Sequence, residues 1–203
     1  FRSNLDIVDG DASALIRPGK PTLPSMLKKA GYSTAVIGKW HLGLGDGVVD
    51  WNKEVKPGPR EIGFDYSFLM PSTGDRVPSV YLENHTIIGL DPNDPIAVSY
   101  GEKVGSRPTG RERPDLLRYQ ADDQHSDTII NGVSRIGTMA GGEAALWLDE
   151  EFVDIFTGKA RDFIRGNKDD PFFLFYSFHD IHVPRLPNPR FIDFNTESEI
   201  CCS

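Results

Sequence analysis

Two side chains that could hold an anion and transfer a proton follow a short apolar run near the start of the sequence. Lys39 and His41 flank Trp40 directly after the run at residues 34–38. An amine and an imidazole on the same side of an extended chain can hold an anion and move a proton. Glycines on both sides would let the backbone approach a ligand closely. A surface lysine beside a core histidine would give the same local pattern, so both interpretations stay open at this point.

A second group of polar residues follows the apolar run 171–178, where His179 and His182 lie three residues apart. A pair of histidines can contribute to a zinc site, but such a site needs three or four ligands and no cysteine is nearby. The alternative is two solvated loop histidines. Thr73 and Arg76, in the turn 73–76, could bind an oxyanion through a hydroxyl and a planar guanidinium. A polar turn with an internal Asp–Arg contact competes with that interpretation.

The elements that must position these residues form two helix–strand units. Residues 22–30 have the apolar spacing of a short helix with Thr22 as its N-cap, and the β-branched run 33–37 follows as a buried strand. Residues 149–165 have the same helical spacing, with Asp149 as the expected cap. The continuous apolar run 171–178 then predicts a strand covered on both faces.

This order of elements predicts a parallel α/β sheet with its chemistry at the carboxyl ends of the strands. The segment between the two units is different in character. Residues 44–120 are rich in Gly, Pro, Asp and Arg, and we expect long functional loops there. Short strands are predicted at 80–82 and 86–88.

Composition excludes several classes of function. The chain has 203 residues, 38% of them hydrophobic, and a net charge of −8. The acidic balance argues against general nucleic-acid binding, which needs a basic face. No apolar stretch approaches the roughly 20 residues of a membrane span. The two cysteines, Cys201 and Cys202, are adjacent and cannot close a long loop with each other.

Several motifs resemble one enzyme family in the family's own order. Gly38-Lys39-Trp40-His41-Leu42-Gly43 resembles the second signature of the type I, formylglycine-dependent sulfatases. The segment 171–187 is similar to their later strand and histidine segment. Gly63-Phe64-Asp65-Tyr66 matches between the two, and residues 10–32 resemble the region that leads to the second signature. Together the matches cover most of residues 9–192.

This resemblance implies a fold and a place within it. The fold would be an alkaline-phosphatase-like α/β/α sandwich with a mostly parallel sheet, incomplete at both ends. Residues 1–203 would be the middle portion of an arylsulfatase-like catalytic domain. The substrate would be a small sulfated molecule, either an aryl sulfate or a sulfated sugar. Family members are exported, periplasmic or lysosomal, and the same is expected here.

The resemblance also implies roles for individual residues. Lys39 would hold the sulfate and the formylglycine hydroxyl group. His41 would lie against the second hydroxyl of the hydrated formylglycine and help to expel sulfate. His182 would contact the sulfate and protonate the leaving alcohol. It is chosen over His179 because the family's histidine precedes an X-Pro step. Candidate substrate contacts, carried over more loosely, are Thr73, Arg76 and Arg185.

Two parts of the family's site have no match in this sequence. The nucleophile signature, C/S-x-P-S-R, is expected upstream of residue 9, and residues 1–8 do not match it. The Ca²⁺ ligands come from an early paired-Asp segment and a late Asp-Asn segment, which would fall before and after this chain. Cys201 and Cys202 lack the context of the nucleophile. We therefore expect Ca²⁺ and formylglycine in the full-length parent, no metal ligands in this chain, and no turnover by this chain alone.

Two other functions stay open on the sequence. One is a phosphoesterase of the same superfold, although such enzymes generally use two zinc ions and several Asp and His ligands. The other is a non-catalytic protein, either a degenerate binding module or a fragment without a stable fold.

Overall fold

The computed structural model describes residues 8–191, and its centre is a five-stranded sheet with the order β4-β3-β2-β1-β9. The central strand β1 (Ser33–Lys39) pairs in parallel with β2 (Tyr66–Met70) and with β9 (Phe172–Ser177). The short strands β3 (Leu82–Glu83) and β4 (Thr86–Ile87) extend the sheet as an antiparallel hairpin beside β2. The predicted α/β sheet is confirmed, and its three longest strands are parallel.

The first helix–strand unit forms as its local sequence predicts. Helix α1 spans Leu23–Lys29, and the Thr22 side chain accepts a hydrogen bond from the Ser25 amide in a capping box. Gly31 then has a φ of 89°, which ends the helix in a left-handed conformation. The chain turns directly into β1, whose central residues are fully buried.

The second unit begins differently from the prediction. A 3₁₀ turn, η4 (Asp149–Glu151), precedes α2 (Phe152–Gly166), and the N-cap of α2 is Glu151 without a side-chain hydrogen bond. The predicted role of Asp149 as the cap is therefore wrong, because its carboxylate is bound by a buried arginine instead. The helix does end at Asn167, as expected.

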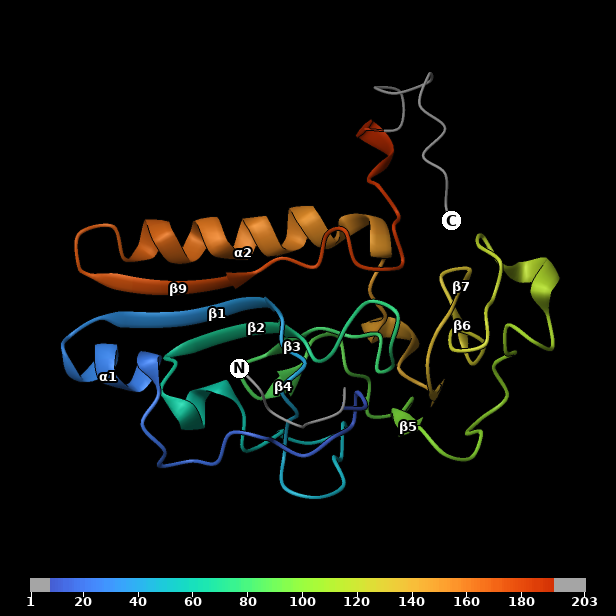
Figure 1. Cartoon of the computed structure of the whole chain (residues 1–203), viewed down its shortest axis with the longest axis horizontal. Coiled ribbons are helices and arrows are strands. Elements are labelled where there is room, and N and C mark those ends of the chain that lie inside the picture. The colour runs from blue at the N-terminus through green and yellow to red at the C-terminus, as the bar shows by residue number, and fades with distance from the viewer. Residues whose placement is uncertain (1–7, 192–203) are drawn as a thin grey trace.

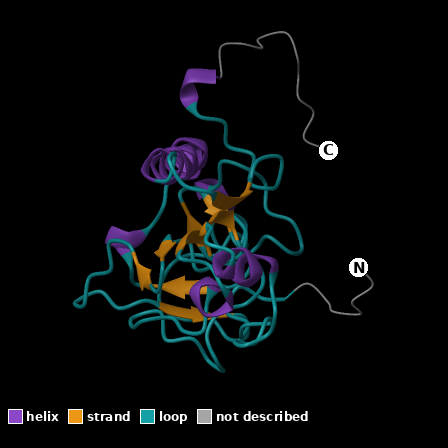
Figure 2. Cartoon of the chain, turned by 90° about the vertical axis from the view of Figure 1, so that its left-hand side faces the viewer, coloured by secondary structure: helices purple, strands orange, loops and turns teal. Residues whose placement is uncertain are grey.

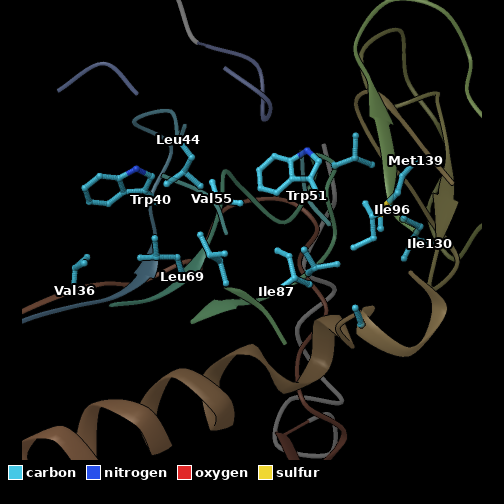
Figure 3. Close-up of a cluster of buried hydrophobic side chains, with 14 of the residues drawn as sticks. Val36, Trp40, Leu44, Trp51, Val55, Leu69, Ile87, Ile96, Ile130 and Met139 are labelled. Atoms are coloured by element: carbon cyan, nitrogen blue, oxygen red, sulfur yellow. The ribbon is translucent and has the colours of Figure 1, made fainter. Parts of the chain in front are cut away.

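Alternate side chains of the sheet build two cores. Ile37, Phe68 and Met70 pack under α2, together with Phe152 and Phe156 of that helix. Val36 and Leu69 point to the other face, where Trp40, Leu44 and Trp51 complete a larger core (Figure 3). Figure 1 shows α2 along β9 and β1, with α1 on the other side of the sheet. Figure 2 gives the same layers with α2 seen nearly end-on.

Strand β9 forms an edge of the sheet in the described part of the chain, and its side chains are only half-buried. Phe175 is 46% exposed, and Phe178, just beyond the strand, is 64% exposed. The prediction of a strand covered on both faces is therefore wrong for residues 8–191. Aromatic content predicted the strand correctly, but it could not show how much of the strand is covered.

The segment between β2 and α2 consists mainly of loops with very short elements, as expected. It carries the hairpin β3–β4, then β5 (Ala97–Ser99) paired with β8 (Thr138–Ala140), and β6 (Ile129–Ile130) paired with β7 (Val133–Ser134). Its remaining 3₁₀ turns are η2 (Pro114–Leu116) and η3 (Glu143–Ala145), and η1 (Pro59–Ile62) precedes β2. These loops gather beyond the carboxyl ends of β1, β2 and β9 (Figure 1, right).

No helix within residues 8–191 is long and apolar enough to cross a membrane. Residues 1–7 and the pair Cys201–Cys202, on which two sequence-based expectations depend, lie outside the described residues.

Candidate active site

The carboxyl end of β1 presents the first two candidate residues. Gly38 has a φ of 108°, and a Cβ there would lie 2.0 Å from the carbonyl oxygen of Ser177, so only glycine lets β1 end against β9 at this point. Lys39 is the last residue of the strand, and His41 follows in a left-handed conformation with φ 54°. Trp40 between them points into the core (Figure 3).

Both cationic side chains are partly desolvated. Burial lowers the pKa of Lys39, and Arg76 acts in the same direction while Asp75 opposes it. Burial also lowers the pKa of His41, although its hydrogen bond with the Val8 carbonyl oxygen, at 2.9 Å from Nε2, opposes this shift. Asp75 and Arg76 therefore act on the pKa of both Lys39 and His41.

The turn after β2 carries the next group. Asp75 is only 4% exposed, and its Oδ2 lies 3.0 Å from Nε2 of His125. Its Oδ1 lies 3.8 Å from Nδ1 of His182. Burial would raise the pKa of Asp75, but the His125 hydrogen bond, the nearby Thr73 hydroxyl and the charges of His182 and Arg76 lower it to about 2. Asp75 is therefore anionic throughout the physiological range.

The two histidines after β9 have different environments. His179 is 4% exposed, packs edge-on against the Phe152 ring at 5.0 Å, and accepts a hydrogen bond from the Gly74 amide at 3.0 Å. His182 is more exposed, and its ring centre lies 5.6 Å from that of His179. The buried residue is therefore a structural partner of the Gly74 backbone, and His182 is the one available to a ligand.

Gly74 is required for this arrangement. A Cβ at Gly74 would lie 2.7 Å from Nε2 of His179 and 3.1 Å from Cδ of Pro184. The Gly74 carbonyl oxygen accepts a hydrogen bond from the buried guanidinium of Arg135. Arg135 in turn forms a bidentate pair with Asp149, with both N–O distances at 2.7 Å. The start of α2 therefore fixes the turn that carries Asp75.

A cavity of about 380 Å³ opens beside Asp75 and the residues that follow His182. Its polar lining comes from the middle loops and the loop after β9, and includes Tyr119, Gln120, Asp122, His125 and Arg185. Val133, Val183 and Pro184 add apolar surface. A mixed lining of this kind suits a compact, hydroxyl-rich ligand.

The family model named Sulfatase matches residues 2–200 of this chain. The chain belongs to the sulfatase family. In this member of the family, Nδ1 of His182 lies 3.8 Å from Oδ1 of Asp75, and the same carboxylate acts electrostatically on Lys39 and His41.

Similar proteins support the same assignment. The chain is 51% identical over 191 residues to an N-acetylgalactosamine-6-O-sulfatase of Bacteroides thetaiotaomicron, covering 94% of this chain and 37% of that protein. It is 25% identical over 198 residues to rat steryl-sulfatase, covering 89% of this chain and 33% of that enzyme. The chain therefore spans little more than a third of the length of these curated relatives.

A solved structure gives the fold. A Bacteroides thetaiotaomicron 6S-sulfatase, from work on the metabolism of multiple glycosaminoglycans, superimposes with a TM-score of 0.92 at 50% identity. The match covers 94% of this chain and 40% of that one. The predicted alkaline-phosphatase-like α/β architecture of the sulfatases is confirmed.

The remaining predicted residues differ in how they are placed relative to Asp75 and the cavity. Thr73 is buried beside Asp75, with 1% of its surface exposed. Arg76 lies between Asp75 and Asp9, 4.0 Å from the latter carboxylate. Arg185 is exposed and lines the cavity. The sequence analysis missed His125, which no motif marks, and did not give Asp75 a role of its own.

The family uses Ca²⁺, and residues 8–191 contain no cluster of side chains that could serve as its ligands. No group of three or more His, Cys, Asp or Glu side chains within residues 8–191 could hold a metal ion. Asp75, the most buried carboxylate near the candidate residues, faces histidines. The chemical roles proposed for this chain therefore rest on its own side chains.

Burial of His179 predicts an acid-sensitive step in stability. Burial, reinforced by the charge of His182, lowers the pKa of His179 from 6.5 to about 4. Between these values the unfolded chain binds the extra proton, so the free energy of unfolding decreases as the pH falls from 6.5 to 4. The full effect is on the order of 3 kcal/mol. Urea titrations of the full-length protein at several pH values would measure it.

The control for this pH effect is His179→Gln, which cannot titrate. We expect its free energy of unfolding to be lower overall but flatter between pH 6.5 and 4. His125 acts in the opposite direction, because its carboxylate partners raise its pKa and its contribution is lost as the pH rises. An unchanged slope in His179→Gln would show that another group causes the acid sensitivity.

Proposed function

We propose that the full-length protein hydrolyses sulfate esters and that this chain supplies its anion-holding and proton-transferring residues. The observation that carries the proposal is the convergence of Lys39, Arg76 and His182 around Asp75, at the carboxyl ends of strands in a sulfatase fold. A tetrahedral anion placed there would be close to an amine, a guanidinium and an imidazole. Such groups stabilise negative charge as it develops on the sulfate oxygens.

The roles of the three proposed catalytic residues are those that the family resemblance implies, and their positions support them. Lys39 holds the sulfate, since its amine is partly desolvated and next to Arg76. His182 gives a proton from Nε2 to the leaving alcohol, because its Nδ1 faces the Val183 carbonyl and Asp75. His41 has a lowered pKa, and its Nε2 faces the Val8 carbonyl oxygen and so carries the proton of the neutral ring, which leaves Nδ1 as the proton acceptor. The nucleophile and Ca²⁺ that the family uses would come from outside this chain.

The substrate class we propose is a sulfated sugar. The cavity beside His182 has phenol, amide, carboxylate and guanidinium groups in its lining, which match the hydroxyl and acetamido groups of an amino sugar. A relative at 51% identity is named for N-acetylgalactosamine 6-O-sulfate. An aryl sulfate would use the apolar part of the lining and less of the polar part. Arg185, which lines the cavity, is the candidate substrate contact there, whereas Thr73 is buried beside Asp75 and is not among the lining residues.

The test compares sulfate and phosphate esters with the full-length protein. We expect release of sulfate from N-acetylgalactosamine 6-sulfate and from 4-nitrophenyl sulfate, and little release of phosphate from 4-nitrophenyl phosphate. Lys39→Ala should lower kcat/KM for the sulfates about a hundredfold. Lys56→Ala, which removes an exposed lysine paired with Glu54, is the matched control. Preference for the phosphate ester would overturn the proposal in favour of a phosphoesterase.

A further inference from the structure

Asp75 is a buried carboxylate whose two oxygens face different histidines. Oδ2 accepts a hydrogen bond from Nε2 of His125 at 3.0 Å. Oδ1 is buried beside the Thr73 hydroxyl without a hydrogen bond of ordinary geometry, and it lies 3.8 Å from Nδ1 of His182. A buried carboxylate oxygen without a partner is costly unless a nearby positive charge compensates it. The protonated ring of His182 would provide that charge.

The hydrogen bond of His182 fixes which nitrogen is free. Nδ1 lies 2.9 Å from the Val183 carbonyl oxygen, which can only accept, so Nδ1 carries a proton. Nε2 is then the nitrogen that exchanges a proton with a ligand. A general acid at Nε2 needs the imidazolium form, with protons on both nitrogens, and a carboxylate near Nδ1 stabilises that form.

The other charged groups around His182 do not provide this stabilisation. The ring of His179 lies 5.6 Å away, and burial keeps it neutral at neutral pH, since its pKa is lowered to about 4. Lys39 and Arg76 carry positive charge and interact with Asp75 and with each other, so they cannot stabilise a further cation. Asp149 is bound by Arg135 in a bidentate pair. Asp75 is the negative group that lies close to the His182 ring within residues 8–191.

His125 holds Asp75 from the opposite side. Its Nδ1 lies 2.8 Å from Asp122 Oδ2, and its Nε2 lies 3.0 Å from Asp75 Oδ2. Both ring nitrogens are therefore engaged by carboxylates, which leaves none to bind a substrate. This arrangement fixes the orientation of the Asp75 carboxylate and directs Oδ1 toward His182.

We propose that Asp75 is a positioning residue, which His125 fixes through Oδ2 and whose Oδ1 stabilises the imidazolium form of His182, while the Val183 carbonyl oxygen orients the ring. The inference rests on the proposed function, because it assigns His182 the role of general acid. It goes beyond that function by linking a loop histidine that no sequence motif marks to the reacting proton. Asp75 also lines the cavity, but in this scheme it acts on the reacting proton through His182.

Kinetics of the full-length protein give one test. Asp75→Asn keeps the shape of the side chain and removes its charge, so we expect kcat for N-acetylgalactosamine 6-sulfate to fall at least about tenfold. The alkaline limb of the kcat–pH profile should move to lower pH by about one unit, because the imidazolium is less stable. His125→Gln should shift the limb in the same direction by less. Asp115→Asn, which alters an exposed pair with Arg113, is the matched control. An alkaline limb that does not move in a folded Asp75→Asn variant would overturn the proposal.

Imidazole NMR of the same protein gives a second test that requires no turnover. In the unmutated protein, neutral His182 should carry its proton on Nδ1, and in Asp75→Asn the neutral form of the ring should persist to lower pH. A proton on Nε2 of neutral His182 would overturn the inference without any variant. If the unmutated protein releases no sulfate, the proposed function fails, whereas the NMR titration still decides whether Asp75 stabilises His182.

Discussion

Replacing His182 by glutamine should lower kcat for a sugar sulfate by about a hundredfold to ten-thousandfold. Glutamine can still donate a hydrogen bond to sulfate, but it cannot transfer a proton to the leaving alcohol. A sugar alkoxide is a poor leaving group, so the loss of that proton falls directly on the rate of S–O bond cleavage. Steady-state kinetics of the full-length protein with N-acetylgalactosamine 6-sulfate would measure the change.

A second substrate separates proton transfer from sulfate binding. The phenolate of 4-nitrophenyl sulfate leaves readily without protonation, so His182→Gln should affect its hydrolysis far less. His85→Gln is the matched control, because His85 pairs with Glu61 near the β3–β4 hairpin, at 2.9 Å. If both sulfate esters lose activity to the same extent, His182 binds the sulfate and does not protonate the alcohol.

The position of Lys39 in the site could be predicted because residues close to it in the sequence determine it. Apolar residues at helical spacing and a capping threonine determine α1, a continuous apolar run determines β1, and Gly38 lets the strand approach β9 just before Lys39, its last residue. Parallel pairing then brings the carboxyl ends of β1 and β9 together. This places Lys39 and the His182 loop at the same end of the sheet. The family motifs lie in these same segments.

The contacts that fix the site could not be predicted, because they join distant segments. His125 and Asp75 are 50 residues apart and meet through a loop with no periodic pattern. Asp149 looked like a helix cap from its neighbours, but the buried guanidinium of Arg135 binds it instead. A charge-assisted bidentate pair in a dry environment outweighs the single hydrogen bond of a local cap. Local sequence gives no signal for such a competition.

The ion pair between Arg135 and Asp149 leads to the largest expected effect on stability. Both side chains have no exposed surface, and the guanidinium also donates to the carbonyl oxygens of Ile130 and Gly74. Asp149→Asn would remove the negative charge and leave a buried arginine without compensation. We expect the free energy of unfolding of the full-length protein to fall by about 3–5 kcal/mol, measured by urea denaturation. Asp154→Asn, which alters an exposed pair with Arg190, should change it by less than about 1 kcal/mol.

The double variant Arg135→Met/Asp149→Leu distinguishes an uncompensated charge from a packing defect. Replacing both partners removes the buried charges together, so the double variant should be more stable than Asp149→Asn alone. Its site should nevertheless be impaired, because the Gly74 carbonyl loses its donor and the turn that carries Asp75 loses its anchor. Recovery of stability without recovery of sulfate release would show that the pair is retained for the geometry of the site. A double variant as unstable as Asp149→Asn would instead assign the loss to packing at the start of α2.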